Sequence, residues 1–195
     1  MEKRILFVFA CWILLFTSLK TEAQIQAGNV MVGGDISKLD LSLDEGGNFS
    51  FTLNPKVAWF IVDNTAIGGY LTFSLTTASG DGSSISYGIG ALGRHYLGDK
   101  PGNLLYRSRF FLEANVGIEG DNPAVGDNTN GLGIGGGPGW AFFVTPNVSL
   151  EALFKYNGII GFGSAVTSND LTLSLGFQIF LPTSKLRAME KDLKK

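Results

Sequence analysis

Period-two alternation of apolar and polar residues is the feature that most limits how this chain can fold. In the run Leu171–Leu181 (LTLSLGFQIFL), the odd-numbered residues are all apolar, whereas the even-numbered ones include Thr172, Ser174, Gly176 and Gln178. Successive side chains of a β-strand point to opposite faces, so the run predicts a strand with one apolar face. A soluble sandwich would bury that face in a core, whereas an outer-membrane barrel would turn it toward lipid.

Seven further runs repeat this alternation, and after residue 23 no window is apolar enough for a membrane-spanning helix. The eight runs lie at about Gln26–Ser37, Asn48–Ile61, Thr65–Thr77, Ser83–Leu97, Leu105–Ile118, Gly131–Val144, Val148–Asn157 and Leu171–Leu181. They are longer than the roughly 5–6 residues usual in globular proteins and match the roughly 9–11 that cross a bilayer at a tilt.

The connections between the runs are expected to alternate in length. Short connections are Val62–Asn64, Gly98–Asn103 and Thr145–Asn147; longer ones are Lys38–Gly47, Glu119–Asn130 and Gly158–Ser168, with Ala78–Gly82 intermediate. Short turns on one rim and long loops on the other are typical of outer-membrane barrels with both chain ends in the periplasm. We therefore predict an all-β fold, an eight-stranded antiparallel up-and-down transmembrane β-barrel.

The composition favours lipid outside this barrel. Only 16% of the residues are charged, and the polar face of the runs is mostly Gly, Ser and Thr, which would make a poor water-exposed surface. The same small residues suit the lumen of eight strands, which is just wide enough for side chains. A formal net charge of -2 without a basic stripe argues against a nucleic-acid partner.

The N-terminus has the pattern of a secretory signal peptide. Lys3 and Arg4 precede an apolar run, Ile5–Leu19, and Thr21-Glu22-Ala23 fits a signal-peptidase site. The run is shorter than the roughly 20 residues of a retained transmembrane helix. The only cysteine, Cys11, lies inside it, so the mature chain is expected to hold no disulfide and no thiolate metal site. The predicted organisation is a signal peptide at 1–23, a barrel at 24–182 and a basic periplasmic tail at 183–195.

Two segments resemble a known family. Pro55–Gly68 (PKVAWFIVDNTAIG) is similar to the strand, tight turn and strand unit of small outer-membrane β-barrel proteins, the OmpA- and OmpX-like family, and Phe143–Glu151 is similar to a second copy. The resemblance covers essentially Gln26–Leu181. It implies a protein of the bacterial outer membrane, with membrane lipid as its surroundings, and implies little about activity.

The last strand resembles the C-terminal signal by which that family is handed to the outer-membrane insertion machinery. Gly176, Ile179 and Leu181 occupy the matching positions. The resemblance therefore implies that the insertion machinery is a partner of this chain.

Charged residues on the inward face form a predicted lumen charge cluster. Its members are Lys56, Arg94, Arg109, Glu113, Glu151 and Lys155, and Asp35 can join them. Unpaired charge in a narrow lumen is costly, so we expect salt bridges that fill the interior; a gated ion path is the functional alternative. On the outward face, Trp59, Tyr106, Trp140 and Phe142 are predicted to form an aromatic girdle at the membrane interface.

No catalytic, cofactor or metal site is predicted. His95, the only histidine, is on the outward face without a serine placed to act as a nucleophile. The glycine series Gly131–Gly139 lacks the Lys-Ser/Thr of a phosphate loop and is predicted to allow close packing in the lumen. Acidic residues assigned to the extracellular loops, including Glu119 and Asp121, show no calcium-loop spacing.

These observations predict a monomeric, integral outer-membrane protein with a plugged lumen and a structural or surface-interaction role. Two alternatives stay open, a small-solute pore and a secreted lipocalin-like carrier of an apolar ligand.

Overall fold

The computed structural model describes residues 25–41, 49–78, 82–98, 107–124, 128–162 and 168–183. These residues form eight β-strands: β1 (Val30–Leu41), β2 (Phe49–Val62), β3 (Thr65–Ala78), β4 (Gly82–Tyr96), β5 (Ser108–Asn122), β6 (Thr129–Thr145), β7 (Val148–Gly161) and β8 (Ser168–Leu181). In this part of the chain no helix is long and apolar enough to cross a membrane. The predicted signal peptide and residues 184–195 of the predicted tail lie outside the described residues.

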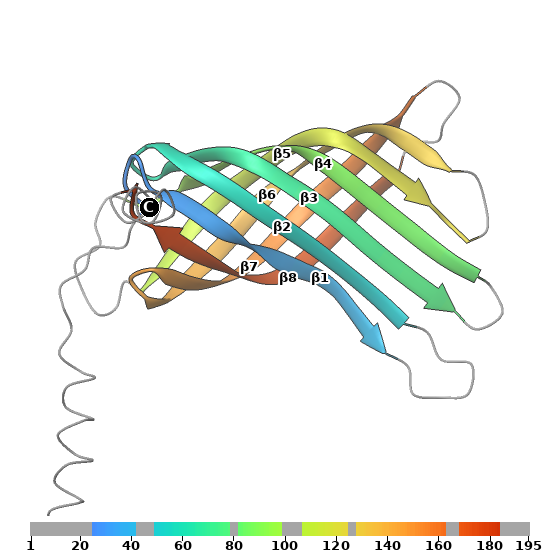
Figure 1. The fold of residues 1–195 in the computed structure, drawn as a ribbon, viewed down its shortest axis with the longest axis horizontal. Helices are drawn as coiled ribbons and strands as arrows, with labels where there is room; N and C mark the ends of the chain where they lie inside the picture. The colour runs from blue at the N-terminus through green and yellow to red at the C-terminus, as the bar shows by residue number, and fades with distance from the viewer. Residues whose placement is uncertain are drawn as a thin grey trace, which may run out of the picture.

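The strands form a closed barrel in which each strand pairs antiparallel with its sequence neighbours (Figure 1). Closure comes from β1 and β8, where Val30 faces Leu181 and Ile36 faces Leu175. This pairing covers only the first part of β1, whereas β3 pairs with β4 along its whole length. The predicted eight-stranded antiparallel up-and-down barrel is therefore confirmed.

The first and last described residues, Ile25 and Thr183, lie at one rim, which we call the terminal rim. This rim also carries the turn at residues 63–64, the connection at 97–107 and the turn at 146–147. The opposite end is the distal rim. In the first turn Asn64 has a φ of 65°, a left-handed conformation that asparagine tolerates better than most residues.

The predicted alternation of short and long connections holds for most connections but not for all. The connection at 97–107 on the terminal rim is long, and the one at 79–81 on the distal rim is short. The strands run farther toward the distal rim than the apolar alternation indicates, because polar pairs inside the lumen continue the sheet. Ser86 Oγ, for example, donates to Asp121 Oδ1 at 2.7 Å, beyond the predicted end of that strand at Ile118.

The apolar faces of the strands point outward. Leu171, Leu173 and Leu175 are 64–67% exposed, whereas Ser174 and Gln178 of the same strand are 3% and 1% exposed. The exterior of the barrel is therefore apolar, and the lumen receives the polar face.

Candidate functional site in the barrel lumen

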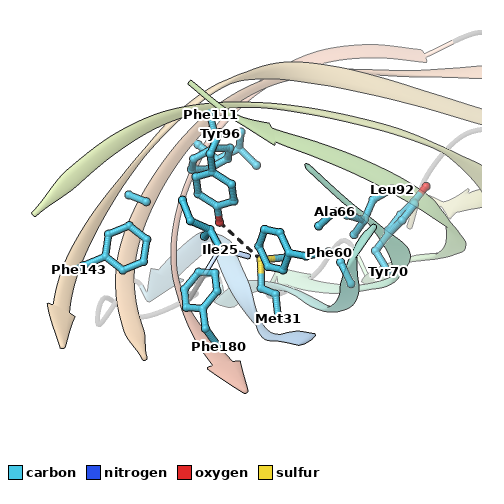
Figure 2. Packing of buried hydrophobic residues seen from close by; sticks show 13 residues of the cluster. Ile25, Met31, Phe60, Ala66, Tyr70, Leu92, Tyr96, Phe111, Phe143 and Phe180 are labelled. Carbon is cyan, nitrogen blue, oxygen red and sulfur yellow. Dashed lines mark hydrogen bonds between the residues drawn. The ribbon is translucent and has the colours of Figure 1, made fainter. Parts of the chain in front are cut away.

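Apolar side chains fill the lumen next to the terminal rim (Figure 2). Neighbouring rings lie within ring-contact distance, with centroids 5.4 Å apart for Phe143 and Phe180 and 5.5 Å apart for Tyr96 and Phe111. We call this set the aromatic layer; it consists of Ile25, Met31, Phe60, Tyr96, Phe111, Phe143 and Phe180, all at most 6% exposed. The layer therefore occupies one end of the lumen.

Residues 25–29 form a turn whose backbone hydrogen bonds to neighbouring segments keep Ile25 in this layer. Asn64 N donates to Ile25 O at 2.9 Å, and Gly28 N donates to Phe60 O at 2.7 Å. Gly28 has a φ of 84°, a conformation that glycine adopts without a steric cost. The sequence predicts that the first strand begins at Gln26, which is wrong: β1 begins at Val30, because this turn directs Ile25 into the barrel end.

A chain of ion pairs crosses the lumen beside the aromatic layer. Lys56 Nζ lies 2.7 Å from Asp35 Oδ2 and 2.9 Å from Glu113 Oε1. Arg94 lies 2.6 Å from Glu113 Oε2 and 2.7 Å from Glu151 Oε2. All five residues are at most 8% exposed. We call this set, Asp35–Lys56–Glu113–Arg94–Glu151, the ion-pair chain; its charges alternate in sign from β1 to β7.

Arg94 connects the ion-pair chain with the aromatic layer. Its Nε and Nη2 both donate to Glu113 Oε2, and Nη1 donates to Tyr96 Oη at 3.0 Å. The guanidinium carbon lies 4.0 Å from the centroid of the Phe111 ring, a cation–π contact. Charged hydrogen bonds of this kind are about twice as strong as neutral ones, so Arg94 is the strongest link between the ion-pair chain and the aromatic layer.

Two members of the predicted lumen charge cluster lie outside the ion-pair chain. Arg109 is at the terminal rim, where Nη1 donates to Asn64 Oδ1 at 2.9 Å and to Gly98 O at 3.0 Å. Lys155 lies on the distal side, with Nζ 5.9 Å from the centroid of the Tyr70 ring. The structure thus brings together Lys56, Arg94, Glu113 and Glu151 and adds Asp35 to them.

On the distal side of the ion-pair chain the lumen widens into a polar cavity of about 440 Å³. Its lining includes Ser86, Glu119, Asp121, Lys155, Asn157 and Asp170, and we call it the distal cavity. The assignment of Glu119 and Asp121 to an extracellular loop is wrong, because both residues belong to β5. Both have odd residue numbers, like Glu113, and odd-numbered residues of this strand face the lumen. Continuing the predicted alternation past Ile118 would therefore have placed both in the lumen.

The glycine row of β6 makes room for bulky lumen side chains. A Cβ added to Gly139 would lie 2.2 Å from Cζ of Phe111, and one added to Gly133 would lie 2.4 Å from Cδ of Glu119. Side chains from β5 thus pack directly on the β6 backbone, as the close-packing interpretation of this series requires.

Three of the four residues of the predicted aromatic girdle can be placed in the structure. Trp59, Trp140 and Phe142 are 38–54% exposed on the outer surface, and Tyr106 lies outside the described residues. The ring centroids of Trp140 and Phe142 are 6.1 Å apart. Whether this belt sits at a lipid interface stays a prediction.

The predicted insertion signal and the histidine also have defined places. Gly176 pairs with Asp35, while Ile179 and Leu181 pair with Val32 and Val30. A role of these three β8 residues in insertion stays a prediction. His95 is on the outer surface, where Nδ1 lies 2.8 Å from Thr65 Oγ1. Among the described residues no group of three His, Cys, Asp or Glu side chains is placed to hold a metal ion.

Solved structures of outer-membrane barrels are similar to this one. Neisserial surface protein A (NspA) is 20% identical, with 77% of this chain and 95% of that chain covered and a TM-score of 0.52. The N-terminal β-barrel domain of OprF from Pseudomonas aeruginosa is 13% identical, with 80% and 98% covered and a TM-score of 0.48. OprG from Pseudomonas aeruginosa is 10% identical, with 83% and 99% covered and a TM-score of 0.49.

No protein-family model and no curated protein matches the chain. The likeness to NspA shows that this chain has the fold of the small outer-membrane β-barrels that its sequence resembles. At this level of identity the comparison concerns the fold alone.

Proposed function

We propose that this chain is an integral protein of the bacterial outer membrane with a closed lumen, and that it has a structural or surface-interaction role exercised at its distal rim. The observation that carries the proposal is the combination of an apolar exterior with a lumen that is crossed by the ion-pair chain and the aromatic layer.

The exterior supports placement in lipid. Monomeric soluble proteins rarely expose contiguous apolar patches larger than a few hundred Å². Here large apolar side chains are exposed on every one of the eight strands. In a lipocalin-like carrier the apolar faces would point inward around the ligand. The observed orientation therefore argues against the carrier alternative.

The lumen supports a closed barrel. Ion transport through it would require water to pass both the ion-pair chain and the aromatic layer, in which Phe111 and Phe180 are fully buried. Breaking the pairs would leave charge unpaired in a poorly hydrated space, which is strongly unfavourable. The geometry therefore favours a plug over a small-solute pore, and the outward position of His95 gives no support to an enzymatic role.

Two measurements test the proposal. The full chain, expressed with its N-terminal segment, should be recovered in the outer-membrane fraction and show heat-modifiable gel mobility; recovery in the soluble fraction without detergent would contradict membrane placement. In planar bilayers the purified barrel should give no stable channel openings. Openings that vanish in Glu113→Gln and persist in the control Glu119→Gln, which removes a lumen carboxylate outside the ion-pair chain, would contradict the closed lumen.

A further inference from the structure

We propose that the distal cavity is a binding site for a small cation that carries two amino groups and one carboxylate, the chemistry of a basic amino acid. This ligand would reach the cavity from the distal rim, since the ion-pair chain and the aromatic layer block the other end. The inference goes beyond the proposed structural or surface-interaction role by assigning a ligand class to this end of the lumen.

The charged groups of the ion-pair chain and those of the distal cavity differ in whether they have an oppositely charged partner. In the ion-pair chain every charged group has an opposite charge within 2.9 Å. In the distal cavity, Glu119, Asp121, Asp170 and Lys155 form no ion pair with any residue that the structure describes. Ionisable groups inside a membrane protein are costly and commonly mark the path or site of a ligand. The unpaired charges thus coincide with the part of the lumen that has free volume.

Neighbouring side chains orient the carboxylates of this cavity. Tyr70 Oη donates to Glu119 Oε1 at 2.6 Å, and Ser86 Oγ donates to Asp121 Oδ1 at 2.7 Å. The second oxygen of each of these two carboxylates receives no hydrogen bond from the described residues. These oxygens are acceptors available to the amino groups of a ligand.

Asp170 and Lys155 supply further charges of opposite sign. Asn157 Nδ2 donates to one oxygen of Asp170 at 3.2 Å. The ammonium of Lys155 lies 5.9 Å from the centroid of the Tyr70 ring. The carboxylates of Glu113, Asp35 and Glu119 also act on it electrostatically, although none of the described residues forms an ion pair with it. An ammonium of this kind can donate to a ligand carboxylate.

The numbers of carboxylates and ammonium groups in the distal cavity indicate the class of ligand. Of the four carboxylates that line the cavity, Asp35 is paired with Lys56, and the other three stand against one ammonium, so a complementary ligand has more amino groups than carboxylates. A bare metal ion does not fit, because the described acidic residues include no group of three close enough to coordinate one. A volume of about 440 Å³ lies within the range of small-molecule sites, roughly 300–1,000 Å³.

Isothermal titration calorimetry on the folded barrel in detergent micelles tests this assignment. The probes are L-lysine and cadaverine, which is lysine without its carboxylate. Both probes should bind, because both carry two amino groups for the carboxylates, and only lysine carries a carboxylate for Lys155. Glu119→Gln and Asp121→Asn should each weaken lysine binding about tenfold. Lys155→Met should weaken lysine binding and leave cadaverine binding no weaker.

Asp63→Asn is the matched control, because it removes one carboxylate from the exposed turn at the terminal rim and should leave lysine affinity unchanged. Gel mobility verifies that every variant is folded. Absence of binding heat for lysine, an equal effect of Lys155→Met on lysine and cadaverine binding, or unchanged lysine affinity in the cavity variants would overturn the proposal. The titration needs only the folded barrel, so its failure is distinguishable from failure of the membrane placement, which fractionation measures.

Discussion

Replacement of Arg94 by methionine should be among the most damaging single changes in the lumen. Arg94 is 2% exposed and pairs with two carboxylates, Glu113 and Glu151. In Arg94→Met, Glu113 keeps its contact with Lys56, but Glu151 loses its cation and retains only the hydroxyls of Ser149 and Tyr96. Leaving one partner of a buried pair uncompensated costs about 3–5 kcal/mol, so we expect a loss of this size in the free energy of unfolding.

Two related variants separate charge from geometry. Arg94→Lys keeps the cation and loses the planar donor group, so a smaller loss of about 1–3 kcal/mol is expected. In Arg94→Met combined with Glu151→Gln the uncompensated charge is absent. The double variant should therefore be more stable than Arg94→Met alone, by about 1–2 kcal/mol.

Urea unfolding of the barrel in lipid vesicles, followed by tryptophan fluorescence, measures these free energies, with gel mobility reporting the folded fraction. Wild-type stability in Arg94→Met would refute the reasoning. So would strictly additive effects in the double variant, since they would mean that Arg94 and Glu151 do not interact.

Three further changes test other parts of the lumen and the exterior. Gly139→Ala should lower the urea midpoint because its Cβ meets the Phe111 ring, whereas Gly93→Ala, with no atom within 4 Å of the added Cβ, should leave the midpoint unchanged or raise it; equal midpoints would contradict the packing described for β6. Ile25→Asp places a carboxylate in the aromatic layer and should destabilise the barrel by about 3 kcal/mol or more in the same assay; wild-type stability would mean that residues 25–29 contribute little. Trp140 should be quenched by brominated lipid in vesicles, and retained fluorescence would argue against its position at the membrane interface.

The fold was largely predictable because one physical rule, alternation of side chains along a strand, operates in every element. Phe110 and Leu112 project outward while Arg109 and Glu113 project inward, as their parity predicts. The aromatic layer was missed although it obeys the same rule. Phe111 has inward parity, but it follows Phe110, and such pairs of aromatic residues at strand ends blur the alternation.

The identity of the charge partners could not be predicted in the same way. The alternation of side chains places Lys56, Glu113 and Lys155 in the lumen but does not give the position of each along the barrel axis. That position depends on the stagger between strands, and the stagger follows from the pairing across the whole barrel. The turn at residues 25–29 is a second example, because its conformation depends on backbone contacts with β2 and the turn that follows it.

The short pairing between β1 and β8 has a consequence for how the barrel assembles and comes apart. Beyond Ile36 the described residues of β1 have no partner in β8, so this ladder holds fewer backbone hydrogen bonds than that between β3 and β4. It joins the first strand to the last, which makes it the strand pairing with the greatest entropic cost of loop closure. We expect the pairing between β1 and β8 to form last during folding and to separate first when the barrel unfolds. A cross-link across Gly34 and Phe177, which pair within it, would slow unfolding more than a cross-link between any two consecutive strands.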